Sequence, residues 1–360
     1  MPTSTLYDST RKTLATHLSA ALDTQLDTLA LVVVAITQSV SAQLGAIARA
    51  MPLTTTQDGK EQRVRRLLDN ERITRHTHFH PVARHALSGL KGQRVNLLID
   101  RVLLRDTHNV LVVSVGFRRR SIPLAWKVLE HRGCSSLADQ QALLAEAAAV
   151  LPEGVRITVH ADSEFRSYEL FAWLRSCGYH AILGIRGNAH VSWSSKGESQ
   201  TLEHSLPDRD SVAYLSEVSV TGEHHGPVQV LAWWDKNDDA KLIVYAVMTD
   251  LPATWQTYRI GSRRMWIETV FRDWQSSGFG LDKSGIVDAV RFERLLLPLV
   301  LAYVWLVSIG RWVVKRGYRK RIDAGSSTQW QYSLFQLGVG WKEHLGSFTR
   351  ALPTLFSLYL

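Results

Sequence analysis

The stretch LLIDRVLLRDTHNVLVVSVGF, residues 97–117, decides the fold of this chain. Its two apolar halves flank the polar turn RDTHN, which predicts two β-strands paired antiparallel as a hairpin. The first strand is predicted to end on Asp100, directly after three large apolar residues. A carboxylate in such surroundings is costly unless a positive charge lies beside it. We therefore expect a cation next to Asp100.

Strand and helix patterns alternate after this hairpin. Apolar runs predict strands, and the i, i+4, i+7 spacing of Leu143, Ala147 and Val150 predicts a helix. The predicted strands are 95–100, 109–117, 121–129, 155–162 and 179–186, with helices at 139–150 and 167–178. This order, βββαβαβ, predicts an α/β fold with a mixed sheet. The fourth strand also ends on an acid, Asp162.

The flanking regions carry other patterns. Residues 1–85 are predicted to be helical, with a long apolar segment that stops at Pro52. Residues 187–255 contain strand-like runs between turn residues, which predicts a β-rich insertion. Helices return from residue 262 onward. Ser262 is the candidate N-cap of the first of these helices, and Gly278 is its candidate end.

The longest apolar run, 295–309, is shorter than the roughly 20 residues that a membrane helix needs, and it contains Pro298. We predict a buried core helix and no membrane partner. The aromatic-rich tail, 329–360, is expected to pack on the body of the protein. The first residues are polar and mixed, unlike a signal peptide, which predicts a cytoplasmic protein.

Composition restricts the class of partner. The chain has 360 residues, and 42 Lys and Arg against 33 Asp and Glu give a net charge of +9. This excess favours a polyanionic partner, nucleic acid first. The two cysteines, Cys134 and Cys177, argue against a disulfide-built secreted protein and against a cysteine zinc site.

Three acids form the candidate site. Ends of adjacent strands can converge, which would bring Asp100 and Asp162 together. Two neighbouring carboxylates raise each other's pKa unless a cation lies between them, and Mg²⁺ is the natural cation because it prefers oxygen ligands. Glu268 is the best third acid. It lies on a predicted helix whose apolar stripe is Ile267, Val270, Phe271 and Trp274, and its own polar face also carries Arg264, Arg272 and Gln275.

Each acid also has a purely structural interpretation. Asp100 can cap a turn, Asp162 can cap the next helix, and Glu268 can pair with an arginine at i±4. The joint pattern favours a metal site, because the acids fall on the first strand, the fourth strand and a late helix.

The segments that carry these acids are LLIDRV (97–102), VHADSEF (159–165) and RRMWIETVFRDWQSSGFGL (263–281). They resemble the corresponding segments of DDE-type insertion-sequence transposases, whose catalytic domain is ribonuclease H-like. In the family signature an Arg precedes the Glu with three residues between, as Arg264 precedes Glu268 here. The resemblance covers roughly residues 25–315. A β-rich insertion before the Glu and a helical N-terminal region are also typical of the family.

The resemblance implies the chemistry. Asp100, Asp162 and Glu268 would be the catalytic residues and the ligands of two Mg²⁺ ions, with Mn²⁺ as a substitute. One ion would activate a water or a 3′-hydroxyl, and the other would stabilise the leaving 3′-oxygen. The substrates would be transposon-end and target DNA. The active species would be a homodimer that holds both ends in a synaptic complex.

The resemblance also implies a domain division. A helical DNA-binding region would span 1–88, the two parts of the catalytic domain 89–186 and 258–322, the β-rich insertion 187–257, and the tail 323–360.

Three signature positions differ from the family pattern. Gly261 stands where the family has Tyr, and Gln275 stands where it has Lys. Both positions typically contact end DNA, so altered end binding is expected. Val102 stands where many members have Thr or Ser.

Basic side chains are the candidates for DNA contact. They are Arg65 and Arg66 on a predicted helix, Arg118, Arg119 and Arg120 in a predicted turn, and Arg264 and Arg272 beside Glu268, and the neutral Gln275 is a further candidate. The alternative in each case is a solvated surface. In RHTHFHP, extended backbone would place His76, His78 and His80 on one face, as in a zinc site. The favoured interpretation is a linker that contacts phosphates.

These patterns predict a transposase that binds the inverted ends of a mobile element, cuts them and joins them to target DNA, acting on the nucleoid. Two alternatives stay open. One is a ribonuclease H-like nuclease without strand transfer, and the other is a repurposed, non-catalytic DNA-binding protein.

Overall fold

The computed structural model describes residues 3–105, 107–193, 199–206, 212–220, 223, 225–236, 241–275, 277–326 and 330–342. Its centre is a 10-stranded mixed sheet of order β3-β2-β1-β4-β5-β10-β9-β8-β6-β7. The strands are β1 (Arg94–Leu104), β2 (His108–Phe117), β3 (Arg120–Leu129), β4 (Arg156–Ala161), β5 (His180–Arg186), β6 (His190–Trp193), β7 (Ser199–Thr201), β8 (Val212–Val220), β9 (His225–Lys236) and β10 (Leu242–Thr249).

The predicted order βββαβαβ is present. Strands β1, β2 and β3 form an antiparallel meander, and β4 lies parallel to both β1 and β5. The predicted end of the first strand at Asp100 is wrong. β1 continues to Leu104, because Val102 and Leu104 keep the alternating burial of a strand and pair with Val110 and His108. Asp100 therefore lies within a paired strand, opposite Val112.

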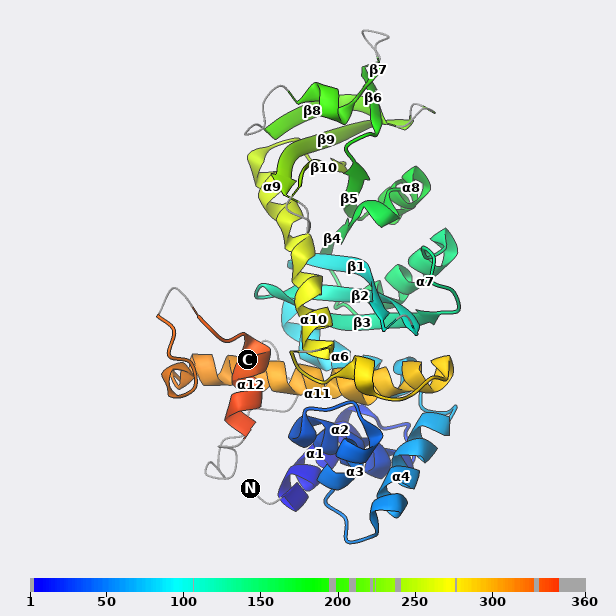
Figure 1. The fold of residues 1–360 in the computed structure, drawn as a ribbon, viewed down its shortest axis with the longest axis vertical. Helices are drawn as coiled ribbons and strands as arrows, with labels where there is room; N and C mark the ends of the chain where they lie inside the picture. Colours follow the sequence, from blue (N-terminus) through cyan, green and yellow to red (C-terminus); the bar gives the residue numbers. More distant parts are fainter. Residues whose placement is uncertain are drawn as a thin grey trace.

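Helices cover both faces of this part of the sheet. Figure 1 shows α7 (Leu137–Ala148) and α8 (Tyr168–Ser176) on one side, with α9 (Trp255–Gly261) and α10 (Trp266–Trp274) on the other. The apolar stripe of α10 is buried as predicted: Ile267, Val270, Phe271 and Trp274. This stripe fixes the helix across β1, β2 and β3 and turns its polar face away from the core.

The predicted ends of this helix need correction. Ser262 is not its N-cap, because the chain is already helical upstream, where the Thr254 side chain accepts from the Thr257 N–H to begin α9. The Ser262 hydroxyl instead donates to the Arg259 carbonyl at 2.9 Å, and a short 3₁₀ turn, η4 (Ser262–Met265), links α9 to α10. α10 ends at Trp274, before Gly278.

The N-terminal residues are helical, as predicted. The helices are α1 (Thr3–His17), α2 (Asp23–Ser39), α3 (Leu44–Ala50), α4 (Gln57–Asp69), α5 (Arg75–His78) and α6 (His80–Leu87). The apolar segment that precedes Pro52 is broken between α2 and α3. Val40 adopts a left-handed conformation with φ 47°, and its N–H bonds back to the Ile36 carbonyl, so the chain turns by 100°.

The long apolar run forms α11 (Ala289–Lys315), which contains Pro298. This helix is long and apolar enough to span a membrane, but 83% of its most apolar window is buried inside the protein. It packs against α2, β3 and α12 (Leu334–Lys342), so the prediction of a core helix is confirmed. α12 is the described part of the tail that was expected to pack on the body, and residues 343–360 lie outside the described residues.

The described residues within 187–255 include the strands β6 to β10, as the turn pattern predicted. β10 pairs antiparallel with β5, and β9 pairs with β10. The five-stranded core therefore continues into a second group of strands in the same sheet, seen at the upper end of Figure 1.

Candidate active site

Asp100 lies on β1 with only 8% of its surface exposed. Its Oδ1 accepts the backbone N–H of Arg101 at 2.7 Å. Asn96 on the same strand lies beside Gly116 and the ring of Trp266 at the start of α10. Because strand residues two apart share a face, Asp100 faces the side of the sheet that α10 crosses.

Asp162 follows β4 and begins a 3₁₀ turn, η2 (Ser163–Phe165). Its Oδ1 accepts the backbone N–H of Glu164 at 2.8 Å, so Asp162 caps this 3₁₀ turn, whereas the predicted helix that follows is capped by Ser167. This cap uses one carboxylate oxygen and fixes the direction of the other. Gly184 on β5 makes room for the turn, because a Cβ at that position would lie 2.6 Å from the Ser163 nitrogen.

Glu268 lies in the first turn of α10 and is half-buried. Two contacts hold this helix on the sheet. The Trp266 ring packs on Gly116, where a Cβ would approach it to 3.1 Å. Near the other end, Asp273 accepts a hydrogen bond from Arg120 on β3. The position of Glu268 is thus fixed from both ends of α10.

Asp162 and Glu268 lie near enough to Asp100 for their charges to act on its carboxyl group. Burial, together with the charges of Asp162 and Glu268, raises the pKa of Asp100 to about 7, against the opposing effects of the Arg101 N–H and Arg264. Arg264 contributes positive charge, but its Nη2 donates to the Met265 sulfur at 3.4 Å. The site therefore holds more negative charge than its protein neighbours balance, which is the condition for binding a hard divalent cation.

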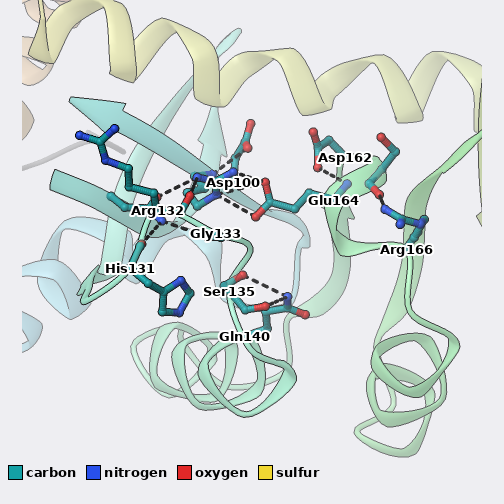
Figure 2. Close-up of polar contacts among 12 residues, drawn as sticks. Asp100, His131, Arg132, Gly133, Ser135, Gln140, Asp162, Glu164 and Arg166 are labelled. Atoms are coloured by element: carbon teal, nitrogen blue, oxygen red, sulfur yellow. Dashed lines mark hydrogen bonds and ion pairs between the residues drawn. The ribbon is translucent and has the colours of Figure 1, made fainter. Parts of the chain in front are cut away.

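A second layer of contacts joins the strands that carry the two aspartates (Figure 2). Arg101 donates to both oxygens of Glu164, and its Nη1 donates to Asn109 Oδ1 at 3.0 Å. Asn109 Nδ2 in turn donates to the carbonyls of His131 and Gly133. Sequence reasoning missed these residues. The sequence signal for them is their position: Arg101 directly follows Asp100, and Glu164 lies two residues after Asp162.

The candidate DNA contacts separate into two groups. Arg118 and Arg119 form the turn between β2 and β3 and are exposed, with φ 47° and 65°. Arg120 differs, because its side chain is 11% exposed and pairs with the buried carboxylate of Asp273. Burial raises the pKa of Asp273 to about 6, although Arg120 opposes the shift. The guanidinium of Arg120 thus pairs with Asp273 and links β3 to α10. This corrects the expectation that Arg120 contacts DNA.

The remaining candidates lie at the surface. Arg272 is exposed on α10, and Gln275 is half-buried directly after the helix. Arg65 and Arg66 are exposed on α4, and Arg65 lines a groove that the 284–288 loop completes. Among the DNA-contact candidates, Arg264 acts electrostatically on Asp100. The charges of Asp162 and Glu268 also reach Asp100, whereas Arg65, Arg66, Arg118, Arg119 and Arg272 are exposed at the surface.

The histidine pattern in 75–81 does not form an extended face. The segment is helical in α5 and α6, which places successive histidines on different sides. His78 is buried and its Nδ1 contacts the Thr77 hydroxyl at 2.7 Å. His76 is exposed, and its ring meets that of His80 at 4.8 Å between centroids.

Residues 128–305 match the family model described as the transposase DDE domain. This match supports a DDE-type insertion-sequence transposase. The match contains Asp162 and Glu268 and begins after Asp100. No curated protein matches the chain. The mixed α/β architecture of this transposase is consistent with a ribonuclease H-like fold, and its family acts on DNA and generally uses divalent metal ions.

Proposed function

We propose that this transposase cuts the inverted ends of its own element and joins them to target DNA by two-metal phosphoryl transfer, with Asp100, Asp162 and Glu268 as metal ligands. The observation that carries the proposal is the convergence of the three carboxylates from β1, β4 and α10, with burial and its two partners holding the pKa of Asp100 at about 7. A buried carboxylate beside two others is costly in the metal-free protein, and cation binding offsets this cost.

The donor set fits Mg²⁺, since it consists of carboxylate oxygens on rigid elements. When bound, a pair of Mg²⁺ or Mn²⁺ ions would activate the attacking oxygen and stabilise the leaving 3′-oxygen. The backbone N–H groups of Arg101 and Glu164 orient Asp100 and Asp162 by holding one oxygen of each. The packing of α10 on β1, β2 and β3 would hold Glu268 in place as the third ligand.

We infer that the catalytic domain is ribonuclease H-like and is formed by residues 89–186 and 258–322, with a β-rich insertion at 187–257 and a helical DNA-binding region at 1–88. The exposed guanidinium groups of Arg118, Arg119 and Arg272, with those of Arg65 and Arg66, supply positive charge for phosphate contacts. Arg264 and Gln275 are the candidate DNA contacts nearest to Glu268. A homodimer would bring the two ends together on the bacterial nucleoid, in the cytoplasm.

The test is Mg²⁺-dependent cleavage of DNA that carries the sequences flanking the gene. Glu268→Gln removes one negative ligand and should reduce cleavage by at least about 100-fold, while DNA binding persists. Glu169→Gln is the matched control, because Glu169 is exposed on α8. Equal cleavage by the Glu268→Gln variant and the wild type would refute the metal assignment.

The same assay distinguishes the alternative functions. A nuclease without strand transfer would cut the ends but would not join a 3′-hydroxyl end to a target plasmid. A repurposed binding protein would bind the DNA with unchanged affinity in Glu268→Gln and would not cut in Mg²⁺ or Mn²⁺.

A further inference from the structure

A second group of metal-ligating side chains lies away from the three acids. His76 from α5, His80 from α6 and Glu146 from α7 each offer a ligand atom, and these atoms all lie within 4.8 Å of one another. Glu146 comes from the α/β core, whereas both histidines precede it in the N-terminal helices. The cluster therefore joins two segments that are about 70 residues apart in the chain.

His80 and Glu146 lie at the spacing of two ligands of one metal ion. His80 Nε2 lies 3.3 Å from Glu146 Oε1, and this buried nitrogen has no other hydrogen-bond partner in the part of the chain that the structure describes. Two ligands of a tetrahedral Zn²⁺ with bonds of about 2.0–2.1 Å lie roughly 3.3–3.4 Å apart. The exposed His76 ring, at the solvent side, can approach by a small side-chain rotation.

The charged side chains around His76, His80 and Glu146 also favour a bound cation. Arg75 donates to both oxygens of Glu146, at 2.8 and 3.1 Å, and to Glu293 Oε1 at 2.6 Å. One guanidinium thus faces two carboxylates. Counted as formal charges, the group holds one more carboxylate than guanidinium, next to His80 Nε2.

We propose that His76, His80 and Glu146 bind one transition-metal ion of the Zn²⁺ class, with water as the fourth ligand. Two imidazoles and a carboxylate are a donor set that Zn²⁺ accepts and that Mg²⁺ does not prefer. The ion would clamp α5 and α6 to α7. It would fix the N-terminal helices relative to the catalytic sheet without taking part in phosphoryl transfer.

The experiment measures Zn²⁺ binding by the full chain in an Asp100→Asn, Glu268→Gln background, in which the acid site is disabled. His76→Gln is the test variant, because His76 is exposed and its loss leaves the core intact. His190→Gln is the matched control, an exposed histidine on β6. The readouts are the stoichiometry of bound Zn²⁺, the absorption spectrum of Co²⁺ as a substitute, and the shift of Tm with Zn²⁺.

The background and His190→Gln should bind one Zn²⁺, give a tetrahedral Co²⁺ spectrum and gain several degrees in Tm. His76→Gln should bind at least about tenfold more weakly and lose most of the Tm shift. Absence of Zn²⁺ binding by the background, or equal affinity in His76→Gln, would overturn the proposal. Because DNA cleavage is not measured, the result does not depend on the proposed transposition chemistry.

Discussion

Arg101 grips the Glu164 carboxylate with two parallel hydrogen bonds, from Nε to Oε1 at 2.8 Å and from Nη2 to Oε2 at 2.7 Å. Arg101 follows Asp100 directly, and Glu164 lies two residues after Asp162. A bidentate pair of this kind fixes both distance and orientation. It therefore sets the separation of β1 and the η2 turn at the place where the two aspartates converge.

Glu164→Gln should weaken the metal site without unfolding the protein. The amide replaces one of the two charged hydrogen bonds, so the two aspartates lose their fixed separation. We expect the Mg²⁺ concentration for half-maximal DNA cleavage to rise about 10- to 100-fold, as for other changes in residues that orient metal ligands. Glu169→Gln on α8 is the control. An unchanged Mg²⁺ requirement in Glu164→Gln would show that the pair has no positioning role.

Asp100→Asn should stabilise the metal-free protein at alkaline pH. The folded pKa of Asp100, about 7, exceeds its unfolded value, so the native state binds more protons between about pH 4 and pH 7. Stability contributed by this group is therefore complete below about pH 4 and is lost as the pH rises through 7. Asn carries no charge and avoids this loss.

The measurement is urea unfolding in EDTA at pH 5 and pH 8. We expect Asp100→Asn to exceed the wild type by about 1–3 kcal/mol at pH 8, with a smaller difference at pH 5. With saturating Mg²⁺ the order should reverse, because only the wild type gains metal-binding energy. A variant less stable than the wild type at pH 8 in EDTA would contradict the assigned pKa direction.

Much of this site is predictable because it depends on local patterns. The apolar runs predict the succession of strands and helices along the chain, and Asp100 and Asp162 stand out as acids that follow apolar runs. Ile267, Val270, Phe271 and Trp274 gave the orientation of α10, since their spacing defines one helical face. Glu268 was then identified as a residue on the adjoining face.

The errors come from partners that are distant in the sequence. Nothing in the sequence near Arg120 indicates that Asp273 is its partner. The sequence therefore does not distinguish the largely buried Arg120 from the exposed Arg118 and Arg119. Asp100 appeared to end β1 because its carboxylate broke an apolar run, but pairing with β2 carries the strand on to Leu104. Likewise, the period-two spacing of the histidines predicts an extended segment, but this segment is helical. Nothing in the sequence indicates that the distant Glu146 lies beside His80.

Arg119→Gly should separate DNA binding from folding. Arg119 has φ 65°, a conformation that costs energy for a residue with a Cβ and that glycine adopts freely. The variant should therefore gain about 0.5–1 kcal/mol of stability in urea unfolding. It should also lose DNA affinity with little dependence on sequence, and the slope of log affinity against log salt should fall by about one. If DNA affinity and its salt dependence are unchanged, the turn that carries Arg119 does not contact DNA.

Gly184→Ala should damage the site through the backbone of the turn that carries Asp162. A Cβ at Gly184 would lie 2.6 Å from the Ser163 nitrogen and 2.7 Å from the Asp162 carbonyl carbon. These are backbone atoms and cannot rotate away, so the η2 turn must move from β5. We expect a loss of about 1–3 kcal/mol in stability, as for overpacking, and at least a tenfold fall in Mg²⁺-dependent cleavage.

Gly45→Ala is the matched control for this last change. A Cβ on Gly45 in α3 would meet only the ends of the Glu61 and Arg49 side chains, at 3.4 and 3.5 Å, and both can move. Alanine is also the better helix former by about 1 kcal/mol. The control should therefore be as stable as the wild type or more stable, with normal cleavage. If Gly184→Ala behaves like Gly45→Ala in both assays, the close approach of β5 does not position Asp162.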